Sequence, residues 1–475
     1  VDRPGVSLAV DPLVLTAPAP APGEQDETEQ EAPARAWSRL LSTVDGFRGE
    51  VLVLPWADAD VAALASADRV DVLTEARQRA GDVAEDLGSV RDDVVWPVGD
   101  GTDQDTVAAA AESGATAVVL PGSHLPPADV LTYTPSGRAE LTTPAGPVQA
   151  ALADERLSAV LRGRGQAVAA GPDEEPTELD DLTARQLLLA DTAVIARERP
   201  AEARSLLLAL PRETEDRPTT VRLAERLDVL QDAPWVELSP LSDLLDLDVP
   251  AVSYEALPAL LPPAPEAIDA GTLRTVDSTL ADVEAFASAT EEPEAFLRRY
   301  TRTLGPAVAT AWRQAPAARD TLVREVAEEV DDLDEQVVAE PSSTLNLIND
   351  LAHIPVRVSS SLPEPVHVDV VLDGPDQRLE ATDTVRVTVP AEGQATAEVP
   401  VQAVGSGTAL VEVALRTPSG EPVGTPTQIT VRVRADWEDV GTAVVASVLV
   451  IMLVVGLVRT ARRGRRMRGE TGGTA

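Results

Sequence analysis

One segment constrains this chain more than any other. Residues 440–458 contain no charged side chain over about 19 positions. At about 1.5 Å per helical residue the segment is about 28 Å long, which matches the hydrocarbon core of a bilayer. A buried core helix is the alternative, but core helices rarely lack every polar break and then end at an arginine cluster. The segment predicts a transmembrane helix at 440–458.

The residues on both sides of this segment predict its orientation. The tail, residues 459–475, carries six arginines and one glutamate, and the positive-inside rule places such a tail in the cytoplasm. The rest of the chain is then extracytoplasmic. We expect Trp437, Arg459, Arg462 and Arg463 at the membrane interface, with the lipid bilayer and its anionic inner leaflet as partners.

Composition excludes several kinds of chemistry. The formal net charge is −40, all basic residues are arginine, and there is no cysteine. Lysine-dependent phosphate loops, Schiff bases, thiol nucleophiles and cysteine zinc sites are therefore excluded. A charge this negative argues against nucleic acid as a partner. We expect no cofactor and no metal.

The chain begins Val1-Asp2-Arg3, without a methionine or an export signal. A protein of this topology needs such a signal, so we expect a segment to precede Val1. The lysine-free composition, rich in alanine, arginine and aspartate, is typical of a GC-rich genome and favours an actinobacterium.

Residues 1–250 alternate short apolar runs with helical patterns, which is typical of a parallel sheet covered by helices. A barrel or a doubly wound sheet fits this pattern, and we prefer an incomplete (β/α) barrel-like domain. Two Pro- and acid-rich stretches, 16–36 and 166–181, are interpreted as surface loops. The apolar runs interpreted as strands are 6–12, 50–60, 94–100, 115–124, 205–212 and 235–245.

Two further regions follow. Residues 251–340 show helical periodicity and predict a helical subdomain. Residues 341–436 contain runs with a period of two separated by Gly and Pro turns, which predict an immunoglobulin-like β-sandwich. Because it leads directly into 440–458, we interpret the sandwich as a juxtamembrane stalk.

The ends of parallel strands are where sites are usually built, and they supply the candidates here. Carboxylates with one histidine suit acid–base work, and tryptophans suit a sugar ring. In the alternative interpretation, an aspartate after a strand caps the next helix, and the histidine is simply exposed. The catalytic candidates are Asp11, Asp58, Asp60 and His124, and the ligand-binding candidates are Trp56 and Trp96.

Other templates for chemistry fail. The sequence has no GxSxG and no HExxH, and no two histidines stand at helical spacing. Residues 99–105 resemble a calcium loop only in part, because the order of acidic ligands and the closing glutamate are missing. His353 and His367 lie in the region of the predicted sandwich and are interpreted as surface residues.

The segments SLAVDP, LPWADADVAAL, WPVGD, ATAVVLPGSHLP and PWVELSPLSDLL resemble a family of actinobacterial envelope proteins of unknown function. That resemblance implies export, a single C-terminal membrane span and a role in cell-envelope assembly, since the genes often lie beside that of the lipid II flippase. The first part also resembles the (β/α) barrels of polysaccharide deacetylases and glycoside hydrolases. Asp11 matches the aspartate after their first strand, but the H-x-x-x-H metal pattern is missing. A glycosidase pair of Asp11 with Asp58, Asp60 or Asp154 stays open.

We therefore expect a single-pass, membrane-anchored binding or scaffold protein of the bacterial cell envelope that is not catalytic. Its expected partners are an envelope glycan, such as peptidoglycan, or a membrane protein of cell-wall synthesis. The alternative is a membrane-anchored carbohydrate-active hydrolase that uses the strand-end carboxylates.

Overall fold

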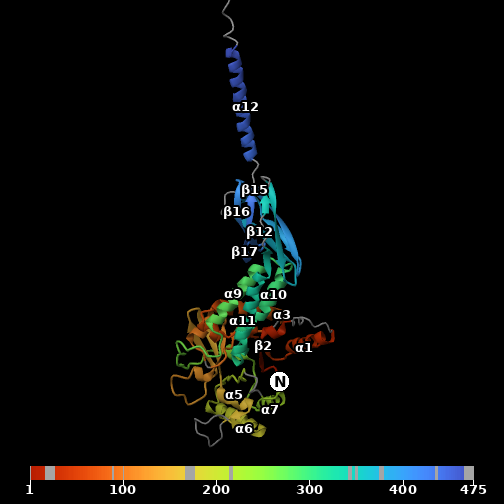
Figure 1. Ribbon diagram of the computed structural model, residues 1–475. Helices are drawn as coiled ribbons and strands as arrows, with labels where there is room; N and C mark the ends of the chain where they lie inside the picture. The colour runs from red at the N-terminus through yellow and green to blue at the C-terminus, as the bar shows by residue number, and fades with distance from the viewer. Residues whose placement is uncertain are drawn as a thin grey trace, which may run out of the picture. The chain divides into compact units, whose positions relative to one another are not determined.

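The computed structural model describes residues 2–16, 27–87, 90–99, 101–165, 177–212, 218–340, 345–347, 351–373, 379–433 and 437–464. The chain forms two compact units (Figure 1). The first comprises residues 1–274 and 303–323, and the second comprises 275–302 and 324–475. The predicted helical segment 251–340 is therefore divided between the two units.

The first unit is built on short, mostly parallel strands. Strand β1 (Ser7–Val10) pairs in parallel with β2 (Glu50–Val53). A second sheet has the order β3-β4-β6-β5, in which only β5 is antiparallel to its neighbour. Its strands are β3 (Val94–Val95), β4 (Ala117–Pro121), β5 (Arg138–Thr143) and β6 (Gly146–Ala153). A short antiparallel pair, β7 (Arg164–Gly165) and β8 (Thr177–Glu178), completes the strands described in this unit.

Side chains from successive strands converge on one core. Leu52, Val94, Val119 and Ala151 are buried together there, and Ala9, Trp96 and Leu207 pack against them. Helix α8 (Leu241–Leu245) contributes Leu241, Leu244 and Leu245 to the same core. The predicted combination of helices and sheet is confirmed.

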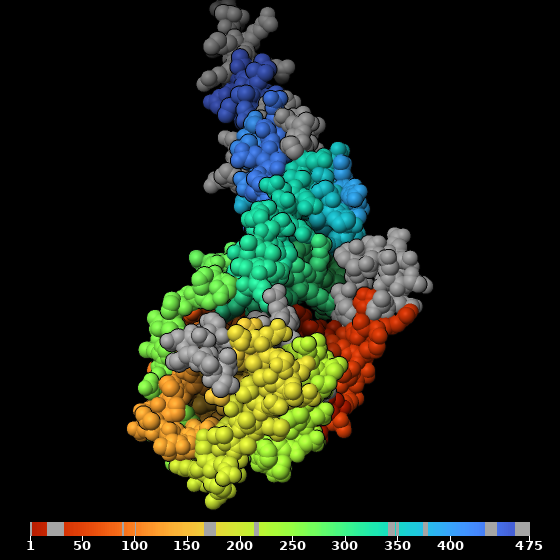
Figure 2. Space-filling model, turned by 90° about the horizontal axis from the view of Figure 1, so that it is seen from below, coloured from red at the N-terminus to blue at the C-terminus, as the bar shows by residue number. Residues whose placement is uncertain are grey.

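Helices surround these strands. Helices α5, α6 and α7 share a second core around Leu157, Leu188 and Leu230. They lie together in Figure 1, and the yellow residues of this layer form a continuous area of the surface in Figure 2. The helices are α1 (Glu27–Asp45), α2 (Val61–Ser66), α3 (Val70–Leu87), α4 (Gln104–Glu112), α5 (Glu155–Arg162), α6 (Asp181–Glu198) and α7 (Thr220–Gln231).

Three local predictions for this unit are wrong. Within the strand and turn predicted at 235–245, residues 241–245 form α8 and no strand is present, because Leu241, Leu244 and Leu245 are buried at helical spacing. Residues 205–212 make only one bridge, between Leu207 and Ala153, since β5 already occupies that edge of β6. Part of the predicted loop 16–36 is helical, because α1 begins at Glu27; residues 17–26 lie outside the described residues, as do 166–176 of the second predicted loop.

The second unit contains helical segments and two β-sheets. The helices are α9 (Ala270–Ala287), α10 (Pro293–Leu304) and α11 (Pro316–Glu335), the first and last of which begin in the first unit. Within the second unit, the Phe296 ring lies between those of Phe286 and Tyr300, with centroid distances of 5.8 and 5.2 Å.

The sheets have the orders β10-β17-β16-β12-β14 and β13-β15-β11-β9. Alternate residues are buried along β12, as the period of two predicts for strands with one wet face. The strands are β9 (Val337–Glu340), β10 (Leu345–Leu347), β11 (Leu351–Ser360), β12 (Val366–Asp373), β13 (Leu379–Ala381), β14 (Val385–Val389), β15 (Gln394–Ala403), β16 (Gly407–Arg416) and β17 (Pro422–Val433).

Helix α12 (Trp437–Gly464) follows. Its described side chains run from residue 444 to 460, and the large apolar ones among them are exposed. Among the residues that the structure describes, no helix has both the length and the apolarity required to cross a membrane. The side chains of Trp437, Arg462 and Arg463 lie outside the described residues, whereas Arg459 is exposed on the helix.

Candidate binding site at the strand ends

Two of the predicted residues meet at the ends of the first two strands. Because β1 and β2 are parallel and Val10 lies opposite Val53, the carboxyl ends of both strands lie on the same side of the sheet. Asp11 follows β1 directly, and Asp58 ends the short 3-10 helix η2 (Trp56–Asp58) after β2. The charge of Asp58 acts on the carboxyl of Asp11, as expected for neighbours.

Asp11 accepts a hydrogen bond from the backbone N–H of Leu13 at 2.9 Å and caps η1 (Pro12–Leu15). Burial raises the pKa of Asp11 to about 6, and the charge of Asp58 also raises it. The backbone N–H groups of Leu13, Ala57 and Asp58 act in the opposite direction. Asp11 is therefore the carboxyl that takes up a proton in mildly acidic conditions.

The turn that carries Asp58 has an unusual backbone. Ala57 and Asp58 both have positive φ angles, 58° and 49°, although neither is glycine. Such a conformation costs about 1–3 kcal/mol per residue and persists only where the surroundings impose it. Ala57 is fully buried here, and the Asp58 carboxylate is bonded to both Arg212 and Thr310.

Arg212 is the central cation of this cluster. Its guanidinium donates to the Asp58 carboxylate and to the backbone carbonyl of Trp96. The guanidinium carbon lies 5.6 Å from the centroid of the Trp96 ring. Its side chain is only 14% exposed. The other predicted tryptophan, Trp56, has the Arg79 guanidinium 4.3 Å from its ring centroid.

The sequence interpretation missed Arg212 and Thr310. Arg212 stands at the end of the apolar run 205–212, so the rule that picked Asp11 and Asp58 could also have selected it. Thr310 had no such signal, because it lies 252 residues from Asp58 in the chain.

Asp60 points into the interior. It caps α2 by accepting from the backbone N–H of Ala63 at 3.2 Å. Its two carboxylate oxygens accept from Arg313 at 2.6 and 2.8 Å, and the two side chains are 3% and 11% exposed. The alternative interpretation of Asp60 as a helix cap thus matches its geometry.

The remaining candidates follow other strands. His124 ends the 3-10 helix η3 (Gly122–His124) after β4 and is half-buried. Asp154 caps α5 through the backbone N–H of Leu157 at 2.9 Å, and burial raises its pKa. His353 is exposed on β11, and His367 on β12 bonds to Thr388. Over the described ranges, no three His, Asp or Glu side chains are grouped so that they could hold a metal ion.

These features define an α/β unit with an arginine-held aspartate at its strand ends, followed by a unit with two β-sheets. The sequence matches the model of the family of unknown function DUF6049 over residues 1–470, and the chain belongs to that family. A comparison with curated proteins found no match.

Several solved structures show weak similarity. The α-amylase AmyC from Thermotoga maritima is 12% identical, with 66% of this chain and 76% of that chain covered and a TM-score of 0.40. Native alpha-2-macroglobulin from Escherichia coli is 19% identical over 21% of this chain and 16% of its own, with a TM-score of 0.17. The C. elegans MSP family member WR4 is 9% identical over 21% of this chain and 98% of its own, with a TM-score of 0.16. These TM-scores are too low to carry an argument.

Proposed function

We propose that this protein is a membrane-anchored, extracytoplasmic binding or scaffold component of bacterial cell-envelope assembly, and that it does not hydrolyse glycans. The proposal takes the mostly parallel strands of the first unit as an incomplete (β/α) barrel whose strand ends form its mouth. It takes residues 440–458 as the membrane span and the β-sheets of the second unit as an immunoglobulin-like stalk.

One observation carries the non-catalytic part: the protein's own donors hold the strand-end carboxylates. Asp58 is bonded to Arg212 and Thr310, and Asp60 is bonded to Arg313. A carboxylate that transfers a proton or attacks a sugar needs a free oxygen within hydrogen-bond reach of the substrate. Displacing Arg313 from Asp60 would leave two buried, unpaired charges, which is costly.

Complementation tests this proposal. The gene is deleted in its host, and either the wild type or an Asp11→Asn/Asp58→Asn variant is expressed at equal membrane level. Both substitutions keep the side-chain shape and an accepting oxygen but remove the acid–base chemistry. We expect the variant to restore growth and envelope integrity. Failure of a folded, inserted variant, together with wall-glycan hydrolysis by the wild type alone, would establish the hydrolase instead.

Fractionation tests the anchor separately. We expect Val450→Arg/Val454→Arg to release the protein from membranes, since each arginine near the centre of a span costs about 2.5–3.5 kcal/mol. Val450 and Val454 are 58% and 52% exposed on α12. Val194→Arg on α6, at a side chain that is 60% exposed, is the matched control and should leave the protein in the membrane fraction. Equal membrane retention of all three proteins would refute the anchor.

One observation favours the hydrolase as a second candidate. Asp11 has a pKa raised to about 6 and lies beside the carboxylate of Asp58. A carboxyl with a raised pKa next to a second carboxyl is the arrangement that glycoside hydrolysis uses. The complementation experiment above decides between the two functions, because Asp11→Asn/Asp58→Asn abolishes this pair.

A further inference from the structure

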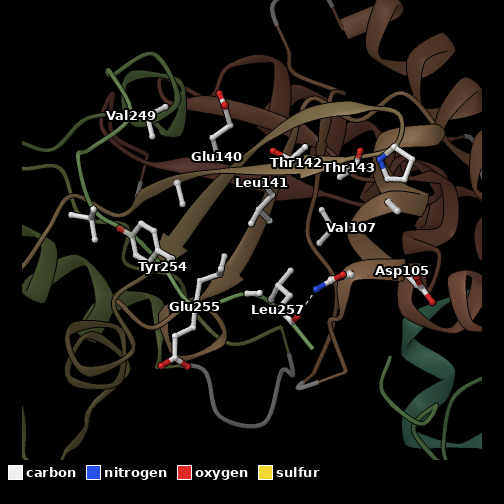
Figure 3. Close-up of a pocket in the computed structure, with 17 residues that line it drawn as sticks. Asp105, Val107, Glu140, Leu141, Thr142, Thr143, Val249, Tyr254, Glu255 and Leu257 are labelled. Atoms are coloured by element: carbon white, nitrogen blue, oxygen red, sulfur yellow. Dashed lines mark hydrogen bonds between the residues drawn. The ribbon is translucent and has the colours of Figure 1, made fainter. Parts of the chain in front are cut away.

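The first unit contains a cavity of about 490 Å³, distinct from the strand-end cluster. Leu125 and three segments line it: the start of α4, strand β5 with the residue after it, and the extended stretch 249–257. Figure 3 shows Val107, Leu141 and Leu257 close together in the middle of the cavity. The carboxylates of Glu140 and Glu255 point away from this apolar centre on opposite sides.

Strand β5 lines the cavity with its edge. Five consecutive residues of β5, 139–143, belong to the lining together with Pro144, although successive side chains of a strand point to opposite faces. A run without gaps therefore means that the backbone edge itself borders the cavity. Strand β5 is also the last strand of its sheet, and β6 is the neighbour with which it pairs.

The register identifies the backbone groups on that edge. The N–H of Leu152 on β6 donates to the carbonyl of Gly137 at 2.8 Å, so Gly137 is in a hydrogen-bonded pair. Because such pairs alternate along an antiparallel ladder, residues 139, 141 and 143 also face β6. The backbone N–H and C=O groups of Glu140 and Thr142 therefore face away from β6.

The opposite wall has the same property. The backbone N–H of Ala128 donates to the carbonyl oxygen of Ser253 at 2.8 Å, and the backbone N–H of Glu255 donates to the carbonyl oxygen of Pro126 at 2.9 Å. Tyr254 lies between these two residues in an antiparallel bridge, so its own backbone groups face the other way. The side chain of Gln104 holds this wall in place by donating to the Leu257 carbonyl at 2.8 Å. The hydroxyl of Tyr254 is buried and has no hydrogen-bond partner within the described part of the chain.

We propose that this cavity binds an extended polypeptide segment of a partner protein, which adds to β5 as a further strand. Strand addition uses the outward backbone groups for affinity and pockets for alternate side chains for specificity. An apolar side chain of the partner fills the space between Val107, Leu141 and Leu257, and the residues beside it are basic. The inference rests on the proposed binding function and names the class of partner.

Charge argues for the basic residues. The seventeen lining residues include Asp105, Glu140 and Glu255 but no arginine, and both glutamates are exposed. The whole chain carries a net charge of −40, so long-range steering also favours a cationic partner. An uncovered strand edge invites unwanted pairing, and acidic side chains along it reject neutral or acidic strands.

The probe is a fluorescent peptide of alternating arginine and valine, five residues long, measured by anisotropy with the full-length protein in detergent. The peptide begins and ends with arginine. Two control peptides have the same sequence and charge but carry backbone N-methyl groups. In one control both valines are methylated, and in the other the first and the middle arginine are methylated. Each removes donors on one side of the peptide. We expect the parent peptide to bind and each N-methylated form to bind at least tenfold more weakly. Absence of binding, or equal binding of all three, would overturn the proposal.

Protein variants test the same surface. Thr142→Pro removes an outward N–H while the ladder to β6 keeps its bonds, because proline is tolerated on the free side of an edge strand. We expect at least a tenfold loss of affinity. Should this variant not fold, Glu140→Gln/Glu255→Gln keeps the backbone intact and is expected to weaken binding severalfold. Its matched control is Glu380→Gln/Glu398→Gln, which removes the same charge from exposed strand positions of the second unit.

The outcomes separate the two proposals. If both glutamine pairs weaken binding equally, general charge explains the peptide's affinity and the β5 site is refuted. Concentration-dependent self-association that Thr142→Pro abolishes would make a second copy the occupant, again against the proposal. If the wild-type protein does not bind the peptide but the Asp11→Asn/Asp58→Asn variant complements fully, the peptide site is refuted and the proposed function stands.

Discussion

The buried pair of Asp60 and Arg313 allows a quantitative test of whether Asp60 serves structure or chemistry. Two bonds of 2.6 and 2.8 Å join side chains that are 3% and 11% exposed. Removing one partner leaves an uncompensated buried charge, which typically costs about 3–5 kcal/mol. We therefore expect Arg313→Met to lower the free energy of unfolding of the first unit by about 3–5 kcal/mol. Asp60→Ala should cost about 1 kcal/mol more, because it also removes the cap of α2.

The assay is urea unfolding of the full-length protein in detergent, with tryptophan fluorescence as the signal. The matched control is Arg156→Met, since Arg156 and Asp191 also make two bonds, of 3.1 and 3.0 Å, but Arg156 is 77% exposed. An exposed pair contributes about 0–1 kcal/mol. The double variant Asp60→Ala/Arg313→Met should lose less than the sum of the single losses. Equal shifts for Arg313→Met and Arg156→Met would refute the structural role.

Other predictions concern single positions. Because the pKa of Asp11 is raised in the folded state, its contribution to stability is present below pH 4 and is lost as pH rises through about 6. Asp11→Asn should therefore reduce the change in melting temperature between pH 4 and 6. It should raise the free energy of unfolding at pH 7.5 by at most about 3 kcal/mol, and thermal scans across pH measure both effects. Gly163→Ala should cost about 1–3 kcal/mol in urea titrations, since φ is +93° there and an added Cβ would lie 2.9 Å from the Arg226 guanidinium. Ile354→Ala, at a fully buried position of β11, should cost about 2–5 kcal/mol by the same measurement.

Periodicity in the sequence was sufficient to place the first strands and the residues at their ends. The apolar runs predicted β1, β2 and β4 because strands of a covered parallel sheet read as continuous apolar segments, and β2 and β4 are largely buried. Asp11 follows β1 directly and Asp58 lies in the short helix η2 after β2, so both could be expected at the same end of the two parallel strands. The capping role of Asp60 was also readable, since an aspartate before an alanine-rich helix is a common signal.

Contacts between distant polar residues could not be predicted in this way. Residues 303–323 return to the first unit, where the N–H of Asp60 donates to Val308 at 2.8 Å and Arg313 pairs with Asp60. A single hydrogen bond across about 250 residues leaves no periodic trace in the sequence. The helix α8 was missed for a different reason, because five residues are too few to distinguish a strand from a helix by pattern.

The way in which the protein uses its arginines bears on its choice of partner. Arg212, Arg226 and Arg313 are largely buried and hold Asp58, Asp181 and Asp60 within the first unit. Arginines bonded to internal carboxylates do not neutralise the surface, so acidic side chains outnumber basic ones there in a chain with a net charge of −40. Such a surface repels anionic polymers and attracts basic segments over about a Debye length, which is about 8 Å at physiological salt. Peptide binding at the β5 edge should therefore weaken as salt is raised, whereas the part due to backbone pairing stays, and each N-methylated peptide should lose the pairing of one side and keep the salt-dependent part.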